Sequence, residues 1–185
     1  MTNFCFSPFP VLVTQRLNLR QITEDDLNEF YILKSDERLL KHYDAKARNF
    51  EESRQKLLAL NRDIAEGDSI TWGITHQNDN KLIGSICLWN FSENQHSAEI
   101  GYELMVDWQG KGIMQEAIKA VIAYGFNQMH LLRIEAVPNP NHIKSINLLK
   151  SNGFAMENVF EEKGNDGNTH PRVLFSLEYA DWQSN

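Results

Sequence analysis

The chain has 185 residues and a mass of 21.4 kDa, and 42% of its residues are hydrophobic, 10% aromatic and 23% charged. These values are typical of one globular domain, and no apolar run reaches the roughly 18 residues that cross a membrane. Twenty-five acidic against eighteen basic side chains give a net charge of −7, the opposite sign to that of a general nucleic-acid binder. We therefore predict one domain over residues 1–185 that binds neither nucleic acid nor a membrane, and whose acidic surface suits a cationic partner such as an amine.

The cysteines and the first residues bear on the cellular compartment. Cys5 and Cys87 lie far apart, and the histidines are scattered without ligand spacing, which argues against a disulfide scaffold and a metal site. The first segment is apolar but has no Lys or Arg before Arg16, and Pro8 and Pro10 interrupt it. We expect no secretory signal, no metal and a cytoplasmic location.

The first part of the chain predicts one strand and two helices. Residues 12–20 alternate apolar and polar side chains toward their end and predict a strand with one solvated face. Thr23 is expected to cap the first helix. The second runs from about residue 50 to 65, ends before Gly67, and has three apolar side chains that we place on one side: Leu57, Leu58 and Ile64. We expect both helices to cover one face of the main sheet.

The rest of the chain predicts a sheet with a central crossover. Three antiparallel strands are expected at residues 69–75, 81–89 and 97–105, joined by turns at 77–80 and 92–95. A helix near Met114 to Ile122, a strand at 132–137, a helix at 143–152 and two strands at 154–162 and 172–179 follow, the last two joined by a turn at 164–167. This order predicts an α+β fold with a mixed, mostly antiparallel sheet of about seven strands flanked by about four helices.

The segment between Met105 and Met114 carries the most information about function. Gly110 and Gly112 lie on either side of Lys111, where a strand gives way to a long helix. Glycine leaves its N–H group unscreened, and a helix start adds unpaired donors and a partial positive charge. Such a turn either binds a diphosphate or merely connects two elements.

Two common phosphate-binding patterns do not fit this loop. A dinucleotide fingerprint needs glycine where the chain has Gln115, and a nucleotide P-loop needs Ser or Thr where it has Gly112. Residues 109–117, Gln-Gly-Lys-Gly-Ile-Met-Gln-Glu-Ala, resemble instead the pyrophosphate loop of the Gcn5-related N-acetyltransferase (GNAT) superfamily, Gln/Arg-x-x-Gly-x-Gly/Ala. Gln109 and Gly112 match, whereas Met114 replaces the small final residue, as is familiar in the branch that resembles ribosomal-protein N-terminal acetyltransferases (RimJ/RimL-like).

Four further segments resemble the same branch in the same order. They are residues 14–20 as the family's first strand, 83–85 as its third, 98–104 as its fourth, and 145–154 as its late helix and following strand. Each is moderately specific alone, but five in order over most of residues 12–179 are hard to obtain by accident. The resemblance implies a GNAT-like acyl-CoA N-acyltransferase fold.

The resemblance also implies where a cofactor binds. Acetyl-CoA is the expected co-substrate, in a V-shaped gap between the family's fourth and fifth strands. The backbone of residues 104–106 is expected to pair with the pantetheine arm, with one N–H near Leu104 polarising the thioester carbonyl, and residues 110–114 to hold the pyrophosphate. The implied cofactor-binding residues are Leu104, Met105, Val106, Gln109, Gly110, Lys111, Gly112, Ile113, Met114, Asn141 and His142.

The attacking amine must be neutral, so the reaction needs a base. The resemblance points Glu99 into the acceptor cleft, which makes it the first candidate, and Glu103 lies on the same face of the same strand. The alternative for both is a solvated strand carboxylate. Glu161 and Glu162 are further candidates, and His142 is another because imidazole titrates in the right range.

Departure of the thiolate is helped by a proton donor. Many family members use a Tyr where this chain has Leu149, whereas the RimL-like branch resembles this chain in having a serine at Ser145. Ser145 is therefore the candidate acid or sulfur ligand. Its alternative role is that of a hydroxyl which satisfies backbone N–H groups at the helix start.

These observations predict an acetyl-CoA-dependent N-acetyltransferase that works by direct attack in a ternary complex. The expected acceptor is a primary amine, above all a protein or peptide N-terminus of the ribosomal-protein type. The alternatives are a small amine, such as a polyamine or aminoglycoside, and a non-catalytic acyl-CoA-binding module. The sequence leaves open a monomer or a homodimer, and it offers Tyr43 and Asp44 as further candidate substrate contacts.

Overall fold

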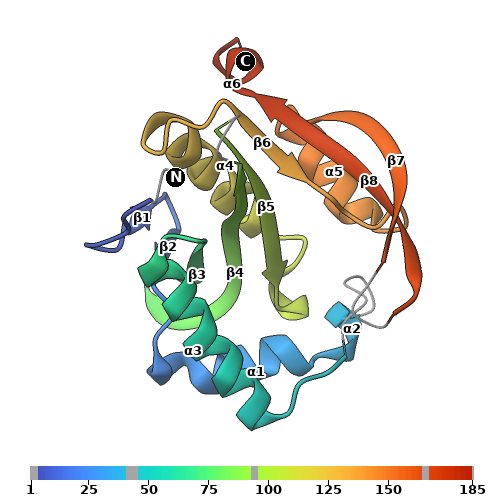
Figure 1. The fold of residues 1–185 in the computed structure, drawn as a ribbon. Coiled ribbons are helices and arrows are strands. Elements are labelled where there is room, and N and C mark those ends of the chain that lie inside the picture. The colour runs from blue at the N-terminus through green and yellow to red at the C-terminus, as the bar shows by residue number, and fades with distance from the viewer. Residues whose placement is uncertain (1–3, 41–45, 93–95, 164–166, 185) are drawn as a thin grey trace.

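A computed structural model describes residues 4–40, 46–92, 96–163 and 167–184 (Figure 1). Within them the chain forms an eight-stranded sheet in the order β1-β2-β3-β4-β5-β6-β8-β7. The strands are β1 (Leu12–Val13), β2 (Leu17–Arg20), β3 (Ile70–His76), β4 (Asp79–Ser92), β5 (Ser97–Leu104), β6 (Arg133–Ala136), β7 (Ala155–Lys163) and β8 (Thr169–Glu178). Neighbouring strands are antiparallel except β5 and β6, which are parallel, so the predicted mixed and mostly antiparallel sheet is confirmed.

The sheet has eight strands rather than about seven because the predicted strand at residues 12–20 is two strands. The chain reverses between them, and the Thr14 N–H donates to the Leu17 carbonyl at 3.0 Å. Leu12 then pairs with Leu19 in an antiparallel register. The alternation of side chains could not reveal this turn, because the turn itself has no Gly, Pro, Asn or Asp.

The described residues contain six α-helices. They are α1 (Leu27–Ser35), α2 (Glu37–Leu40), α3 (Phe50–Glu66), α4 (Ile113–Asn127), α5 (Ile143–Ser151) and α6 (Tyr179–Gln183), with 3-10 turns η1 (Glu24–Asp26) and η2 (Val106–Trp108). The four predicted helices correspond to α1, α3, α4 and α5, and α2 and α6 are additional short helices. None of the described helices is long and apolar enough to cross a membrane. The predicted turn residues 93–95 and 164–166, and the candidate contacts Tyr43 and Asp44, lie outside the described residues.

The ends of α3 show why this helix was predictable. Asn49 and Glu52 cap its start reciprocally, because the Glu52 N–H donates to the Asn49 side chain at 2.9 Å and the Asn49 N–H to the Glu52 carboxylate at 2.8 Å. Gly67 ends it with a φ of +80°, and a Cβ there would lie 2.2 Å from the Phe4 carbonyl oxygen. The prediction for Leu58 was wrong: it is 37% exposed, and Leu60 is buried instead.

The helices lie on both faces of the sheet, as Figure 1 shows. On one face Trp72 of β3 packs edge-on against Tyr124 of α4, with ring centroids 5.4 Å apart. On the other face α1 and α3 pack against each other and against β4 and β3. The expectation that these two helices cover one face is therefore confirmed, and α1 brings Lys34 to Glu103 of β5.

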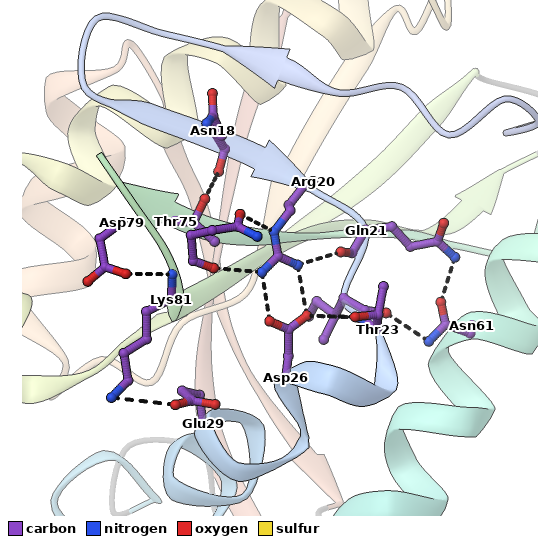
Figure 2. A network of polar contacts seen from close by, with 12 residues as sticks. Asn18, Arg20, Gln21, Thr23, Asp26, Glu29, Asn61, Thr75, Asp79 and Lys81 are labelled. Atoms are coloured by element: carbon purple, nitrogen blue, oxygen red, sulfur yellow. Dashed lines mark hydrogen bonds and ion pairs between the residues drawn. The ribbon is translucent and has the colours of Figure 1, made fainter. Parts of the chain in front are cut away.

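A polar network joins the start of α1 to the sheet (Figure 2). The Arg20 guanidinium donates to both carboxylate oxygens of Asp26 at 2.7 Å, and the Thr23 N–H donates to the same carboxylate at 2.9 Å. Burial alone raises the pKa of Asp26, but these hydrogen bonds outweigh it and the pKa lies below its ordinary value. Thr23 is thus the N-cap of η1, which leads into α1, and the network ties this start to Arg20 of β2.

Candidate active site

The site is built around the point where β5 and β6 separate. The two strands pair only from Ser97 with Arg133 to Glu99 with Glu135, after which β6 ends at Ala136 while β5 continues to Leu104. The Met105 N–H donates to the Ile83 carbonyl of β4 at 2.9 Å. Because alternate residues of a strand direct their backbone groups to opposite sides, those of Tyr102 and Leu104 point into the opening.

The loop that precedes α4 presents a cluster of backbone donors beside this opening. Gly110 and Gly112 have φ values of +75° and +72°, and Gly112 is the N-cap of α4. The first helical hydrogen bond runs from the Glu116 N–H to the Gly112 carbonyl at 3.1 Å. In the described part of the chain the N–H groups of residues 110–115 have no partner. Their donors and the helix dipole together make a site for an anion.

Arg16 and Glu116 hold this loop from behind. The Glu116 carboxylate accepts from the Arg16 N–H at 2.7 Å, from its Nε at 2.6 Å and from the Thr14 hydroxyl at 2.6 Å. Arg16 Nη1 donates to the Lys111 carbonyl at 3.0 Å. Burial alone raises the pKa of Glu116, but these hydrogen bonds lower it below its ordinary value. We call these bonds among Thr14, Arg16, Glu116 and the Lys111 carbonyl the latch. Sequence reasoning missed it, because its partners come from segments about a hundred residues apart.

A cavity of about 420 Å³ opens between this loop, β5 and α5, and we call it the cofactor-side cavity. Its walls comprise seven of the eleven predicted cofactor-binding residues: Leu104, Gln109, Gly110, Gly112, Ile113, Met114 and His142. Lys144, which sequence reasoning missed, also lines it, and its Nζ lies 3.3 Å from the Gln109 side-chain oxygen.

Four predicted cofactor-binding residues lie outside the walls of that cavity. Both backbone groups of Met105 are bonded within the chain, to Ile83 and Trp108, and the Val106 carbonyl accepts from the Gln109 N–H at 3.1 Å. Lys111 directs its ammonium over the Trp108 ring, 5.1 Å from the centroid. Asn141 is exposed. For these four residues the role in cofactor binding stays a prediction. For Lys111 that prediction is supported by its backbone N–H, which belongs to the donor cluster of the loop.

A second cavity, of about 260 Å³, lies between residues 99–102 of β5 and residues 136–139 at the end of β6, and we call it the acceptor-side cavity. Glu99 and Arg172 line it, and Trp89, which is 45% exposed, forms part of its edge. It shares three residues with the cofactor-side cavity: Tyr102, His142 and Ser145. The two cavities therefore meet at these side chains.

The structure distinguishes the candidate bases. Burial, and next the charge of Glu162, raise the pKa of Glu99 from 4.5 to about 7. Glu103 instead forms an ion pair with Lys34 and accepts from the Ser85 hydroxyl at 2.8 Å. Glu161 and Glu162 lie exposed on β7, where Glu162 pairs with Arg172 at 3.2 Å. Glu99 is the one of these four carboxylates that lines the acceptor-side cavity, and its pKa suits a base near neutral pH.

The raised pKa of Glu99 predicts a cost in stability. The folded protein keeps this proton up to about pH 7, whereas the unfolded chain releases it near pH 4.5, so stability falls as the pH rises between these values. We expect Glu99→Gln to remove a penalty of about 1–2 kcal/mol at pH 8 and none at pH 4. In thermal unfolding the variant should melt about 2–6 °C above the wild type at pH 8. Equal melting temperatures at both pH values would contradict the burial of this charge.

Ser145 lies in the first turn of α5, and its hydroxyl is 2.8 Å from the hydroxyl of Tyr102. The N-cap of α5 is His142, which makes no side-chain capping bond. Burial raises the pKa of Tyr102 to about 12, although the hydrogen bond with Ser145 acts in the opposite direction. Sequence reasoning missed Tyr102, whose signal was its place in the strand motif Glu-Ile-Gly-Tyr-Glu-Leu.

Comparisons with known sequences cover most of the chain. A family model described as an acetyltransferase (GNAT) domain matches residues 16–155. YoaA of Bacillus subtilis (strain 168), which is named as an uncharacterized N-acetyltransferase, is 33% identical over 157 residues, 83% of this chain and 88% of that protein. The ribosomal protein uS5-alanine N-acetyltransferase of Escherichia coli (strain K12) is 31% identical over 132 residues, 69% of this chain and 66% of that protein.

Solved structures share the fold. The spermidine N-acetyltransferase from Vibrio cholerae, solved in complex with CoA and spermine, matches with a TM-score of 0.78 and 20% sequence identity. The match covers 90% of this chain and 98% of that chain. At 20% sequence identity this similarity establishes the fold of the chain and does not identify its acceptor.

Proposed function

The chain belongs to the GNAT acetyltransferase family and is an N-acetyltransferase, and on this premise we propose that it transfers the acetyl group of acetyl-CoA to the α-amino group of a protein or peptide N-terminus. The observation that carries the proposal is the opening between β5 and β6. It has the donor loop of Gly110 and Gly112 on one side and the Glu99 carboxylate on the other.

Acetyl-CoA is the co-substrate that suits the cofactor-side cavity. The unpartnered N–H groups of residues 110–115 would hold the diphosphate, and Lys144 adds a positive charge at the edge of the same cavity. The backbone of Tyr102 and Leu104 faces the opening, where it can bond the pantetheine arm and the thioester carbonyl. The fold relative from Vibrio cholerae was solved with CoA, which supports this choice.

The reaction would run as a direct transfer. Glu99 takes a proton from the bound ammonium, and the neutral nitrogen then attacks the thioester carbon and forms the new C–N bond. The tetrahedral intermediate collapses as the C–S bond breaks, and its electron pair stays on sulfur as the CoA thiolate. The second proton of the attacking nitrogen passes to solvent in this step, which leaves a neutral amide. Holding the amine and the thioester together in two cavities that meet at Ser145 supplies much of the rate enhancement.

The pKa of Glu99 favours an α-amino group over an alkyl amine. An α-amino group has a pKa of roughly 7.7–8.0, about one unit above the value near 7 of Glu99. An alkylammonium such as a lysine side chain has a pKa of about 10.4, so the same transfer would be more than two units less favourable. The E. coli relative, which by its name acts on an alanine of ribosomal protein uS5, supports a ribosomal protein as the acceptor.

An acceptor screen tests the proposal. Purified protein and acetyl-CoA are mixed with a ribosomal-protein N-terminal peptide, with spermidine or with an aminoglycoside, and free thiol is followed. We expect kcat/KM for the peptide to exceed the others at least tenfold. The control is the same peptide with a blocked α-amino group and an intact lysine, which should release no thiol above background. Faster turnover of spermidine would favour the small-amine alternative, and acetyl-CoA binding without any turnover would contradict the proposal.

The latch behind the loop provides a second test of the cofactor site. Arg16→Met keeps the length of the side chain but removes the side-chain bonds to Glu116 and to the Lys111 carbonyl, while the backbone N–H of residue 16 still donates to Glu116. We expect the KM for acetyl-CoA to rise about tenfold, with kcat at saturation within about twofold. Arg54→Met, on the exposed surface of α3, is the matched control and should leave both constants unchanged. An unchanged KM in Arg16→Met would show that the latch does not order the loop.

A further inference from the structure

Tyr102 and Ser145 form a pair of hydroxyl groups at the junction of the two cavities. Their oxygens are 2.8 Å apart, and both residues line both the cofactor-side and the acceptor-side cavity. Tyr102 comes from β5 beyond the last residue paired with β6, and Ser145 comes from the first turn of α5. The helix position at which related enzymes were expected to carry a tyrosine holds Leu149, which is fully buried.

The hydroxyl of Ser145 has one hydrogen and two lone pairs, so its hydrogen can serve only one acceptor at a time. A hydroxyl at a helix start commonly accepts from backbone N–H groups, but in the described part of the chain the hydrogen bond of Ser145 is to Tyr102. The structural alternative raised for Ser145, satisfaction of backbone donors, is therefore not the arrangement observed.

The direction of this bond follows from acidity. A phenol is a stronger acid than an aliphatic alcohol, so Tyr102 is the better donor and Ser145 the better acceptor. Burial raises the pKa of Tyr102 to about 12, so that the phenol keeps its hydrogen throughout the physiological range. With Tyr102 as donor, the hydrogen of Ser145 is released to point into the cavity.

We infer that Tyr102 is a positioning residue that directs the hydroxyl of Ser145 at the sulfur of the acetyl donor, an inference that rests on the proposed function. When the C–S bond breaks and its electron pair stays on sulfur, the Ser145 O–H donates a hydrogen bond to the thiolate. No proton needs to leave Ser145, because a thiol with a pKa of about 8.5 is a competent leaving group once its charge is solvated. Glu99 passes to solvent the first proton that it took from the ammonium, and the second proton leaves the nitrogen to solvent as the amide forms.

Steady-state kinetics of three variants test the pair. Tyr102→Phe keeps the ring and removes the hydroxyl, and we expect kcat to fall about fivefold to tenfold while the KM for acetyl-CoA changes less than twofold. Ser145→Ala should lower kcat at least tenfold. Because Tyr102 acts through Ser145, the double variant should be no slower than Ser145→Ala alone. A double variant in which the two losses multiply, or a Tyr102→Phe protein with wild-type kcat, would overturn the inference.

Tyr124→Phe is the matched control. Tyr124 is partly buried on α4 with its ring against Trp72, and within the described chain its hydroxyl has no hydrogen bond. This variant also loses one phenolic hydroxyl, and it should keep wild-type kcat. A loss of kcat equal to that of Tyr102→Phe would show that the removal of any core hydroxyl slows the enzyme, which contradicts a specific role for Tyr102.

A titration of bound CoA gives a readout that needs no acceptor. The ultraviolet absorbance of the thiolate reports its acid dissociation constant, and a hydrogen bond from Ser145 should increase that constant. We expect it to be about tenfold smaller in Ser145→Ala than in the wild type, and about threefold smaller in Tyr102→Phe. If no amine is acetylated but these differences appear, the proposed function is wrong and the inference that Tyr102 positions Ser145 is supported. If the wild type acetylates peptides but Tyr102→Phe has the wild-type kcat and the wild-type acid dissociation constant of bound CoA, the inference about Tyr102 is wrong and the proposed function is unaffected.

Discussion

Glu99→Gln is expected to lower kcat by about a hundredfold or more while leaving the affinity for acetyl-CoA unchanged. Glutamine keeps the shape of the side chain but cannot take a proton from the bound ammonium, and general-base catalysis typically contributes about 10²–10⁴-fold. Glu99 lines the acceptor-side cavity and not the cofactor-side cavity, which is why binding of acetyl-CoA should be spared. Thiol release at saturating acetyl-CoA, together with calorimetric titration of the cofactor, measures the two quantities.

The pH dependence of the wild type provides the complementary measurement. The base is active as the carboxylate, and the pKa of Glu99 is about 7, so kcat/KM should fall roughly tenfold for each pH unit below that value. In Glu99→Gln this acidic limb should move up to the pKa of the α-amino group, roughly 7.7–8.0, because the amine must then lose its proton without the base. Glu103→Gln serves as the comparison, because its carboxylate is occupied by Lys34 and Ser85 and its loss of kcat should be much smaller. A Glu99→Gln protein with wild-type rates would exclude Glu99 as the base.

Gly112→Asp is expected to abolish measurable acetyl-CoA binding, with a Kd at least a hundredfold higher. Gly112 has a φ of +72°, and a Cβ there would lie 3.4 Å from Nη2 of Arg16. The new carboxylate would add negative charge where the diphosphate is expected, and it would compete with Glu116 for Arg16, which holds the loop. Calorimetric titration with acetyl-CoA measures the loss directly.

Gly167→Asp is the matched control for this substitution. Gly167 also has a positive φ, of +83°, and a Cβ there meets no atom within 4 Å. It lies before β8, outside the walls of the cofactor-side cavity. The control carries the same backbone strain and the same added charge, so its affinity for acetyl-CoA should remain that of the wild type. Unchanged affinity in Gly112→Asp itself would refute the assignment of the loop.

Local patterns were sufficient to predict the main elements and the donor loop. Helix α3 could be predicted because apolar spacing, a capping residue and a terminal glycine all act within a few residues of one another. The loop at Gly110 and Gly112 could be predicted for the same reason, since left-handed backbone and a helix start are properties of a short segment. The resemblance to the GNAT family depended on five such segments in order, and the family model confirms it.

Some predictions failed where a distant contact decides the outcome. The alternation of residues 12–20 predicted one strand, but pairing of Leu12 with Leu19 requires the chain to turn back. Helical periodicity placed Leu58 with Leu57, whereas packing against the sheet and α1 buries Leu60 instead. A hydrophobic pattern defines a stripe on a helix, and the neighbouring elements decide where the edge of that stripe falls.

By itself, then, the sequence determined the order of elements, the donor loop and the list of ionisable candidates, because each of these depends on residues close together in the chain. Only the tertiary structure selected among the candidates. It partly buried Glu99 within range of the charge of Glu162, paired Glu103 with Lys34, and joined Tyr102 to Ser145 across 43 positions of sequence. The pKa of a side chain depends on its burial and on the charges around it. Both are determined by residues that are neighbours in space, and the spacing of residues along the chain does not show which residues these are.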